Sequence, residues 1–223
     1  MDLQLHDRTA LVTGASMGIG TGIARVLAAE GVRLAITARR RDALEALAEE
    51  IAAAGHGRPL VIAADITDAE DVQRLAREAE EGLGRVDILV NNAGGTRPLS
   101  VTADDVAWDE AWNLNFTATR RLTQALLGGM RERRWGRIVN FSGSMEPRDV
   151  NGAGAAKAAI QFWSKGLASQ LAAEGSRSTP SRRGGSIPSR SCNGCTRHPR
   201  RARPLSLATF PSVTSASRKT WVM

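Results

Sequence analysis

The sequence predicts an α/β fold built on a doubly wound parallel sheet. Over the first 175 residues, short apolar runs alternate with longer segments whose apolar residues recur at helical spacing. A glycine-rich turn follows the first apolar run, and Gly31 and Gly55 end the first two helical segments. Alternating strands and helices imply right-handed crossovers, so we expect parallel strands with helices on both faces.

The elements follow one another in a regular order. The expected strands are residues 10–13, 32–37, 60–64, 86–90 and 137–141. The expected helices are one carrying Ile19, Ile23 and Leu27, then residues 42–54, one opened by the capping-box spacing of Thr67–Glu70, then 103–133 and 152–174. No strand is expected after residue 174, so the sheet is predicted to be truncated, with its fifth strand as an open edge.

The composition limits the class of protein. No apolar run approaches the roughly 18–20 residues that span a bilayer. The N-terminus lacks the basic and then apolar layout of a signal peptide, so we expect a cytoplasmic protein with no membrane partner. Cys192 and Cys195 are too few for a disulfide framework, and one pair at this spacing without further ligands predicts no metal site.

The glycine-rich turn at residues 13–20 predicts a phosphate-binding loop. Small residues let the backbone approach a pyrophosphate, and the following helix N-terminus supplies N–H donors. The candidate cofactor contacts are Thr13, Gly14, Ser16, Gly18, Ile19 and Gly20. The alternative is an ordinary tight turn between a strand and a helix.

Two arginines favour NADP over NAD. Arg39 and Arg40 end the second strand, about 20 residues beyond the turn, where dinucleotide-binding folds contact the adenosine ribose. An acidic residue at this place binds the ribose 2′-hydroxyl of NAD, whereas arginine accommodates the 2′-phosphate of NADP. The alternative is a solvated basic helix start.

Several motifs together resemble one family. The turn spacing Thr-Gly-x-x-x-Gly-x-Gly, the segment Asn91–Gly94 after the fourth strand and the segment around Lys157 resemble the short-chain dehydrogenase/reductase family, in particular members similar to 3-oxoacyl-carrier-protein reductase. The resemblance covers residues 7–175 and implies a Rossmann-type sheet. It also implies cofactor contacts at Asp65, Ile66, Asn92, Ala93, Gly94 and Lys157, and active-site roles for Asn115, Lys157 and either Ser142 or Ser144.

Some of these implied roles have structural alternatives. Asp65 could equally cap a loop, Asn115 could be a mid-helix asparagine, and Lys157 could be a structural lysine. The family has two adjacent serines after the fifth strand, and without gaps the second falls on Gly143.

The chain departs from the family at its catalytic acid. The family's helix carries Tyr-x-x-x-Lys, and here Ala153 stands where the tyrosine belongs, in a chain that contains no tyrosine. The resemblance implies hydride transfer between NADP(H) and a carbonyl or secondary alcohol, with the tyrosine as general acid/base. The alternative is a pseudoenzyme, or an inactive frameshifted product, that binds the cofactor without turnover.

Residues 176–223 differ in kind from residues 1–175. The tail holds nine Arg, one Lys and no acidic residue, whereas the first 175 residues hold 20 basic and 23 acidic residues. This composition favours disorder and a division into a nucleotide-binding domain and a basic tail. Such a tail would contact nucleic-acid phosphates without specificity, so no specific nucleic-acid partner is expected. The family implies a homo-oligomer formed through the helices at residues 103–133 and 152–174.

The tail has the character of a shifted reading frame. When it is reverse-translated with GC-rich codons and read in another frame, it resembles the later segments of the family. We therefore hypothesise a frameshift near codons 175–176. The DNA sequence across codons 170–223 tests this, and the hypothesis fails if no frame continues in a family-like way.

Overall fold

The computed structural model describes residues 3–143, 146, 149–176 and 206–210, and its centre is a parallel six-stranded sheet. The strand order is β3-β2-β1-β4-β5-β6. The strands are β1 Thr9–Thr13, β2 Arg33–Ala38, β3 Leu60–Ala63, β4 Ile88–Asn91, β5 Arg137–Phe141 and β6 Ser206–Phe210. The predicted doubly wound fold is confirmed, and the strand order changes direction between β1 and β4.

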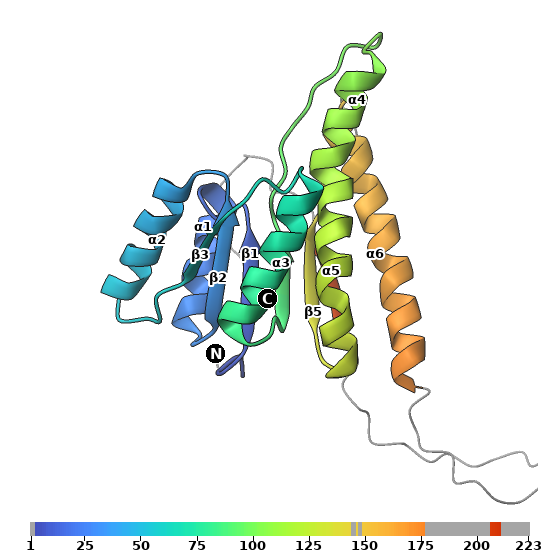
Figure 1. Ribbon diagram of the computed structural model, residues 1–223. Coiled ribbons are helices and arrows are strands. Elements are labelled where there is room, and N and C mark those ends of the chain that lie inside the picture. The colour runs from blue at the N-terminus through green and yellow to red at the C-terminus, as the bar shows by residue number, and fades with distance from the viewer. Residues whose placement is uncertain (1–2, 144–145, 147–148, 177–205, 211–223) are drawn as a thin grey trace, which may run out of the picture.

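Helices cover both faces of this sheet (Figure 1). They are α1 Gly18–Ala29, α2 Arg41–Ala53, α3 Ala69–Leu83, α4 Asp105–Trp112, α5 Ala118–Glu132 and α6 Gly152–Ser176. One core cluster joins α3 and α5 to strand residues such as Leu11 and Leu89. The other joins α1 and α2 to their neighbours Val12 and Val90, which point to the opposite face. None of the helices in the described part of the chain is long and apolar enough to cross a membrane.

The stretch predicted as one helix at 103–133 is interrupted by a π-helical segment, η1 Asn113–Thr117, between α4 and α5. The amide of Asn115 lies in this wide turn, where Nδ2 donates to the carbonyl of Ala111 at 3.0 Å. Single π turns inside helices occur frequently at functional sites. Here the segment carries Asn113 and Leu114 to the edge of the cleft described below.

Two sequence expectations are corrected. The N-cap of α3 is Asp68, whose carboxylate accepts from the N–H groups of Glu70 and Asp71, so the capping box at Thr67–Glu70 is wrong. Thr67 instead donates its backbone N–H to Asp65. An aspartate at N-cap accepts from the free N–H groups of the first helical turn, as a threonine would, and the helix therefore begins one residue later than expected.

The second correction concerns the sheet edge. Residues Ser206–Phe210 form β6 and pair with β5, from Arg137 opposite Ser206 to Phe141 opposite Phe210. The expectation that no strand follows α6 and that β5 is an open edge is therefore wrong. An unpaired strand offers a row of N–H and C=O groups, and Ser-Leu-Ala-Thr-Phe supplies apolar and β-favouring residues to pair with it. Residues 177–205 and 211–223, with Cys192 and Cys195, lie outside the described residues.

A chain of buried polar side chains links α5 to α6 over the strands β4 and β5. The Nδ2 of Asn91 donates to Thr123 at 3.0 Å and to the Oδ1 of Asn140 at 2.8 Å. Asn140 in turn donates to the hydroxyl of Ser164 at 2.8 Å. All four residues are buried, so these bonds replace the water that their polar groups lose on folding.

Candidate functional site

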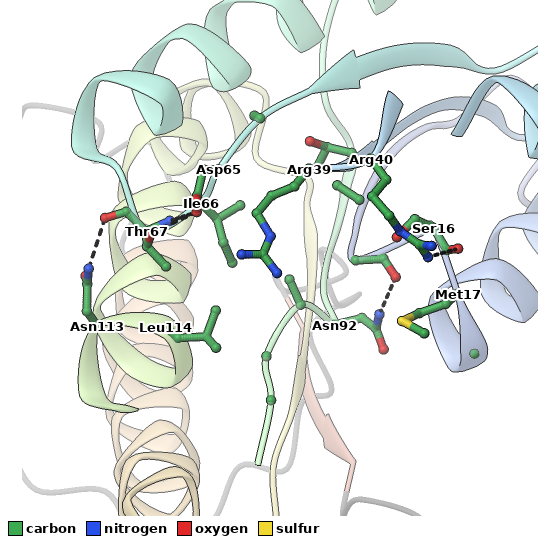
Figure 2. Close-up of a pocket in the computed structure, with 18 of the residues that line it drawn as sticks. Ser16, Met17, Arg39, Arg40, Asp65, Ile66, Thr67, Asn92, Asn113 and Leu114 are labelled. Atoms are coloured by element: carbon green, nitrogen blue, oxygen red, sulfur yellow. Dashed lines mark hydrogen bonds between the residues drawn. The ribbon is translucent and has the colours of Figure 1, made fainter. Parts of the chain in front are cut away.

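A cleft of about 720 Å³ opens at the carboxyl ends of the strands, where the strand order changes direction (Figure 2). In open α/β sheets, ligands bind at this place. Ten of the predicted cofactor contacts line it: Gly14, Ser16, Gly18, Ile19, Arg39, Asp65, Ile66, Asn92, Ala93 and Gly94. Thr13, Gly20 and Lys157 lie behind or beside this lining rather than in it.

The glycine turn has the geometry that its sequence predicts. Gly14 has φ +65°, and a Cβ on it would lie 2.9 Å from the Cα of Ala93. Gly18 has φ +58°, and a Cβ added there would meet nothing within 4 Å, so the backbone in front of α1 is open to a ligand. The N-cap residue Met17 makes no side-chain cap, which leaves the first N–H groups of α1 available.

Thr13 braces the turn instead of lining the cleft. Its hydroxyl accepts from the N–H groups of Asn92 and Ala93 at 3.1 and 3.0 Å and donates to the carbonyl of Val90. The amide of Asn92 donates back to the carbonyls of Thr13 and Gly14. The turns after β1 and β4 are thus joined side by side, and together they form one wall of the cleft.

The two arginines after β2 behave differently. Arg40 donates to the backbone carbonyl of Ser16 at 3.3 Å, which ties it to the glycine turn. Arg39 reaches into the cleft beside Ile66 (Figure 2). Within the part of the chain that the structure describes, no carboxylate or carbonyl bonds to the Arg39 side chain. Its guanidinium is therefore available to an anionic ligand.

Asp65 both lines the cleft and shapes its loop. Its Oδ1 accepts from the N–H of Thr67 at 2.9 Å and from the Thr67 hydroxyl at 2.7 Å. The carbonyl of Thr67 accepts from the amide of Asn113 on the π-helical segment. Asp65 therefore caps the loop through Oδ1, as the structural alternative expected, and it also lines the cleft.

Asn115 and Lys157 meet beside Gly94. The buried Asn115 amide exchanges two hydrogen bonds with the backbone of Gly95, each 3.1 Å long. A Cβ on Gly94 would lie 2.9 Å from Asn115 Oδ1 and 3.0 Å from Lys157 Nζ, so a side chain there would displace both groups. The loop after β5 packs against the stem of Lys157 at Gly143. Ser142 in that loop is buried, and Ser144 lies outside the described residues.

Burial makes Lys157 a weak base. It lowers the pKa of Lys157 from 10.5 to about 8, because the charged amine loses hydration. No hydrogen bond or ion pair reaches its amine from any other described residue. Ala153 precedes Lys157 by four residues, on the same face of α6, and is itself buried. Its methyl group offers no proton at the place where the family has a phenol.

Asn151 supports the site from outside the cleft lining, and the sequence reasoning missed it. Its Oδ1 accepts from the N–H groups of Ala153 and Gly154, so it caps α6, and it also accepts from the N–H of Arg97. Its Nδ2 donates to the hydroxyl of Thr96 at 3.1 Å. An asparagine directly before a helical run is an N-cap signal that could have identified the first role. Lining residues that were not predicted include Met17, Arg97, Glu110, Asn113 and Leu114.

Comparisons with known proteins agree with this geometry. The model of the short chain dehydrogenase family matches residues 8–178. Nodulation protein G of Rhizobium sp. (strain N33) is 41% identical over 174 residues, which cover 76% of this chain and 69% of that protein. The 3-oxoacyl-[acyl-carrier-protein] reductase FabG of Escherichia coli (strain K12) is 35% identical over 178 residues, covering 78% and 71%.

Solved structures show the same likeness. A short chain dehydrogenase from Mycobacterium smegmatis superposes with a TM-score of 0.70 at 31% identity, over 74% of this chain and 72% of that one. A metagenomic short-chain oxidoreductase in complex with NADP superposes with a TM-score of 0.71 at 32% identity, over 75% and 77%.

The lowered pKa of Lys157 predicts that the chain and its Lys157→Met variant differ in stability by an amount that depends on pH. Between pH 8 and 10.5 the unfolded chain binds more protons at Lys157 than the folded chain, so the folded chain gains stability as pH rises through that window. We expect Lys157→Met, without added nucleotide, to be more stable at pH 7 by about 2–3 kcal/mol, and the difference to shrink toward pH 10.5. Urea unfolding at several pH values measures it. The exposed Lys165→Met is the control, and a pH-independent difference would contradict the prediction.

Proposed function

Because the chain belongs to the short-chain dehydrogenase family of oxidoreductases, we propose that it binds NADP(H) and transfers hydride between this cofactor and a carbonyl or secondary alcohol. The observation that carries the cofactor choice is Arg39, which has no partner among the described residues and extends over the cleft. The related metagenomic oxidoreductase was solved in complex with NADP, which supports the same choice.

The residues of the cleft fit a dinucleotide. Its volume of about 720 Å³ lies within the roughly 300–1,000 Å³ of ligand pockets. The open backbone at Gly18 and the uncapped start of α1 would hold the pyrophosphate. Arg39 would hold the 2′-phosphate, and Asp65 and Ile66 would lie against the adenine. The amine of Lys157, beside Gly94, would bind the hydroxyls of the nicotinamide ribose.

The chemistry divides between the bound cofactor and the chain. When bound, the cofactor supplies or accepts the hydride. The chain must deliver a proton to the carbonyl oxygen during reduction, and Ala153 cannot. Lys157, with a pKa of about 8, holds a proton that it can release near neutral pH. It therefore serves as proton donor in place of the missing phenol, directly or through a water. Loss of a positioned general acid typically costs about 10²–10⁴ in rate, so turnover is expected to be slow.

A second candidate function is cofactor binding without turnover. The observation that favours it is Ala153, because ten of the residues proposed to hold the dinucleotide line the cleft while the proton donor of the family is absent. Both candidates share the cofactor site, and they differ in whether NADPH is consumed in the presence of a carbonyl compound.

The remaining expectations belong to the same proposal. We infer a small-molecule carbonyl or alcohol substrate, a cytoplasmic location, and a boundary at residues 175–176 between the nucleotide-binding domain and a basic tail, of which residues 206–210 pair with β5. Assembly through α4–α5 and α6 is supported by apolar side chains exposed on these helices, of which Phe162 is 83% and Val106 66% exposed.

Arg39→Gln tests the cofactor choice. We expect affinity for NADPH to fall at least about 10-fold, because a charge-assisted bond to phosphate is lost, while affinity for NADH stays nearly the same. Titration that follows energy transfer from tryptophan to the bound nicotinamide measures both. Arg41→Gln, which changes an exposed arginine outside the cleft lining, is the control. Equal losses for both nucleotides would contradict the assignment.

Ala153→Tyr tests the catalytic deficit. A phenol four residues before Lys157 would restore a proton donor, so we expect kcat with NADPH and methyl acetoacetate to rise about 10²–10⁴-fold. Ala153→Phe is the matched control, since it adds the ring without the hydroxyl. If the tyrosine variant binds NADPH but is no faster than the phenylalanine variant, Ala153 is not the proton-donor position.

A further inference from the structure

A second arginine lines the cleft away from the glycine turn. Arg97 lies in the loop that leaves β4, three residues beyond Gly94. Gly94 marks the catalytic end of the cleft, because Lys157 and Asn115 meet beside it. Arg40, by contrast, bonds to Ser16 in the glycine turn. The proposed cofactor contacts leave Arg97 without a role, although it faces the same cleft.

The Arg97 guanidinium has most of its donors free. One of its N–H groups bonds to the carbonyl of the preceding residue, Thr96, at 2.9 Å, and a guanidinium has five such donors. The side chain is exposed to the cleft. Glu110 lines the same cleft, yet no carboxylate of the described residues lies within ion-pair distance of Arg97. A cation with free, forked donors in a cleft fits a planar or tetrahedral oxyanion.

The backbone of Arg97 is fixed although most donors of its guanidinium are unpaired among the described residues. Its N–H donates to Asn151 Oδ1 at 3.4 Å, and its carbonyl accepts from the N–H of Gly152 at 3.1 Å. The next residue but one, Leu99, donates to the carbonyl of Val150 at 2.9 Å. These bonds tie the loop to the start of α6, the helix that carries Lys157. The position of the Arg97 backbone relative to the helix that carries Lys157 is therefore set before any substrate binds.

We propose that Arg97 determines substrate class, by binding a carboxylate or phosphate group that the substrate carries near its reacting carbonyl. This inference rests on the proposed function, since it places the substrate at the Lys157 end of an NADP(H)-loaded cleft. A substrate anion bound there would be oriented with its carbonyl toward Lys157, and a neutral analogue would lose that orientation.

The test measures binding to the full chain loaded with NADPH. The probes are two pairs that differ in one anionic group: acetoacetate with methyl acetoacetate, and dihydroxyacetone phosphate with dihydroxyacetone. Their dissociation constants come from the change in fluorescence of the bound NADPH. Arg97→Gln is compared with Arg77→Gln, which removes the same charge from an exposed position on α3 outside the cleft.

We expect at least one anionic probe to bind about 10-fold or more tightly than its neutral partner, and Arg97→Gln alone to abolish that preference. The pair with the larger preference distinguishes carboxylate from phosphate. If NADPH binds but neither anion is preferred, or if the preference survives in Arg97→Gln, the inference is wrong and the proposed function stands. If NADPH does not bind, both are wrong.

Discussion

The hydroxyl of Thr13 and the amide of Asn92 join the turns that follow β1 and β4. These two strands are neighbours in the sheet but far apart in the sequence, and the strand order changes direction between them. Both turns are rich in glycine, whose backbone is the most flexible of any residue. Five hydrogen bonds between residues 13–14 and 90–93 hold the two turns together. The walls of the cleft, the free N–H groups of α1 and the position of Gly94 all depend on this brace.

A second set of polar contacts organises the opposite end of the cleft. Asn115 holds the backbone of Gly95, and Asn151 holds the backbone of Arg97 while it caps α6. The loop between Gly94 and Leu99 is thus fixed to both helices that flank it. Lys157 lies near Asn115 beside Gly94, on the helix that Asn151 caps. Burial lowers the pKa of Lys157 to about 8, and Ala153 on the same helix offers no proton.

The sequence alone predicts the part of the site that depends on local backbone conformation. The turn at Gly14 and Gly18 needs positive φ, which glycine supplies, so its conformation and its place beside the cleft were predictable. The bracing role of Thr13 and the contact of Asn151 with Arg97 were not, because these partners lie 54 to 80 residues away and become neighbours only when the chain folds. Arg97 was missed for a similar reason: no periodicity or motif states which side of a loop faces a cleft.

The polar chain from Thr123 through Asn91 and Asn140 to Ser164 has a consequence for how the strands are aligned. Asn91 and Asn140 are direct partners across β4 and β5, with both side chains buried. A shift of β5 by one residue would turn Asn140 to the other face and leave Asn91, Thr123 and Ser164 with unpaired polar groups in a dry interior. The alternating burial of β5 favours the same alignment, since Ile138 and Asn140 are buried while their neighbours are half-exposed. The amide pair adds a polar penalty for any other alignment, and so helps to fix the position of the strand that leads to Gly143 and the stem of Lys157.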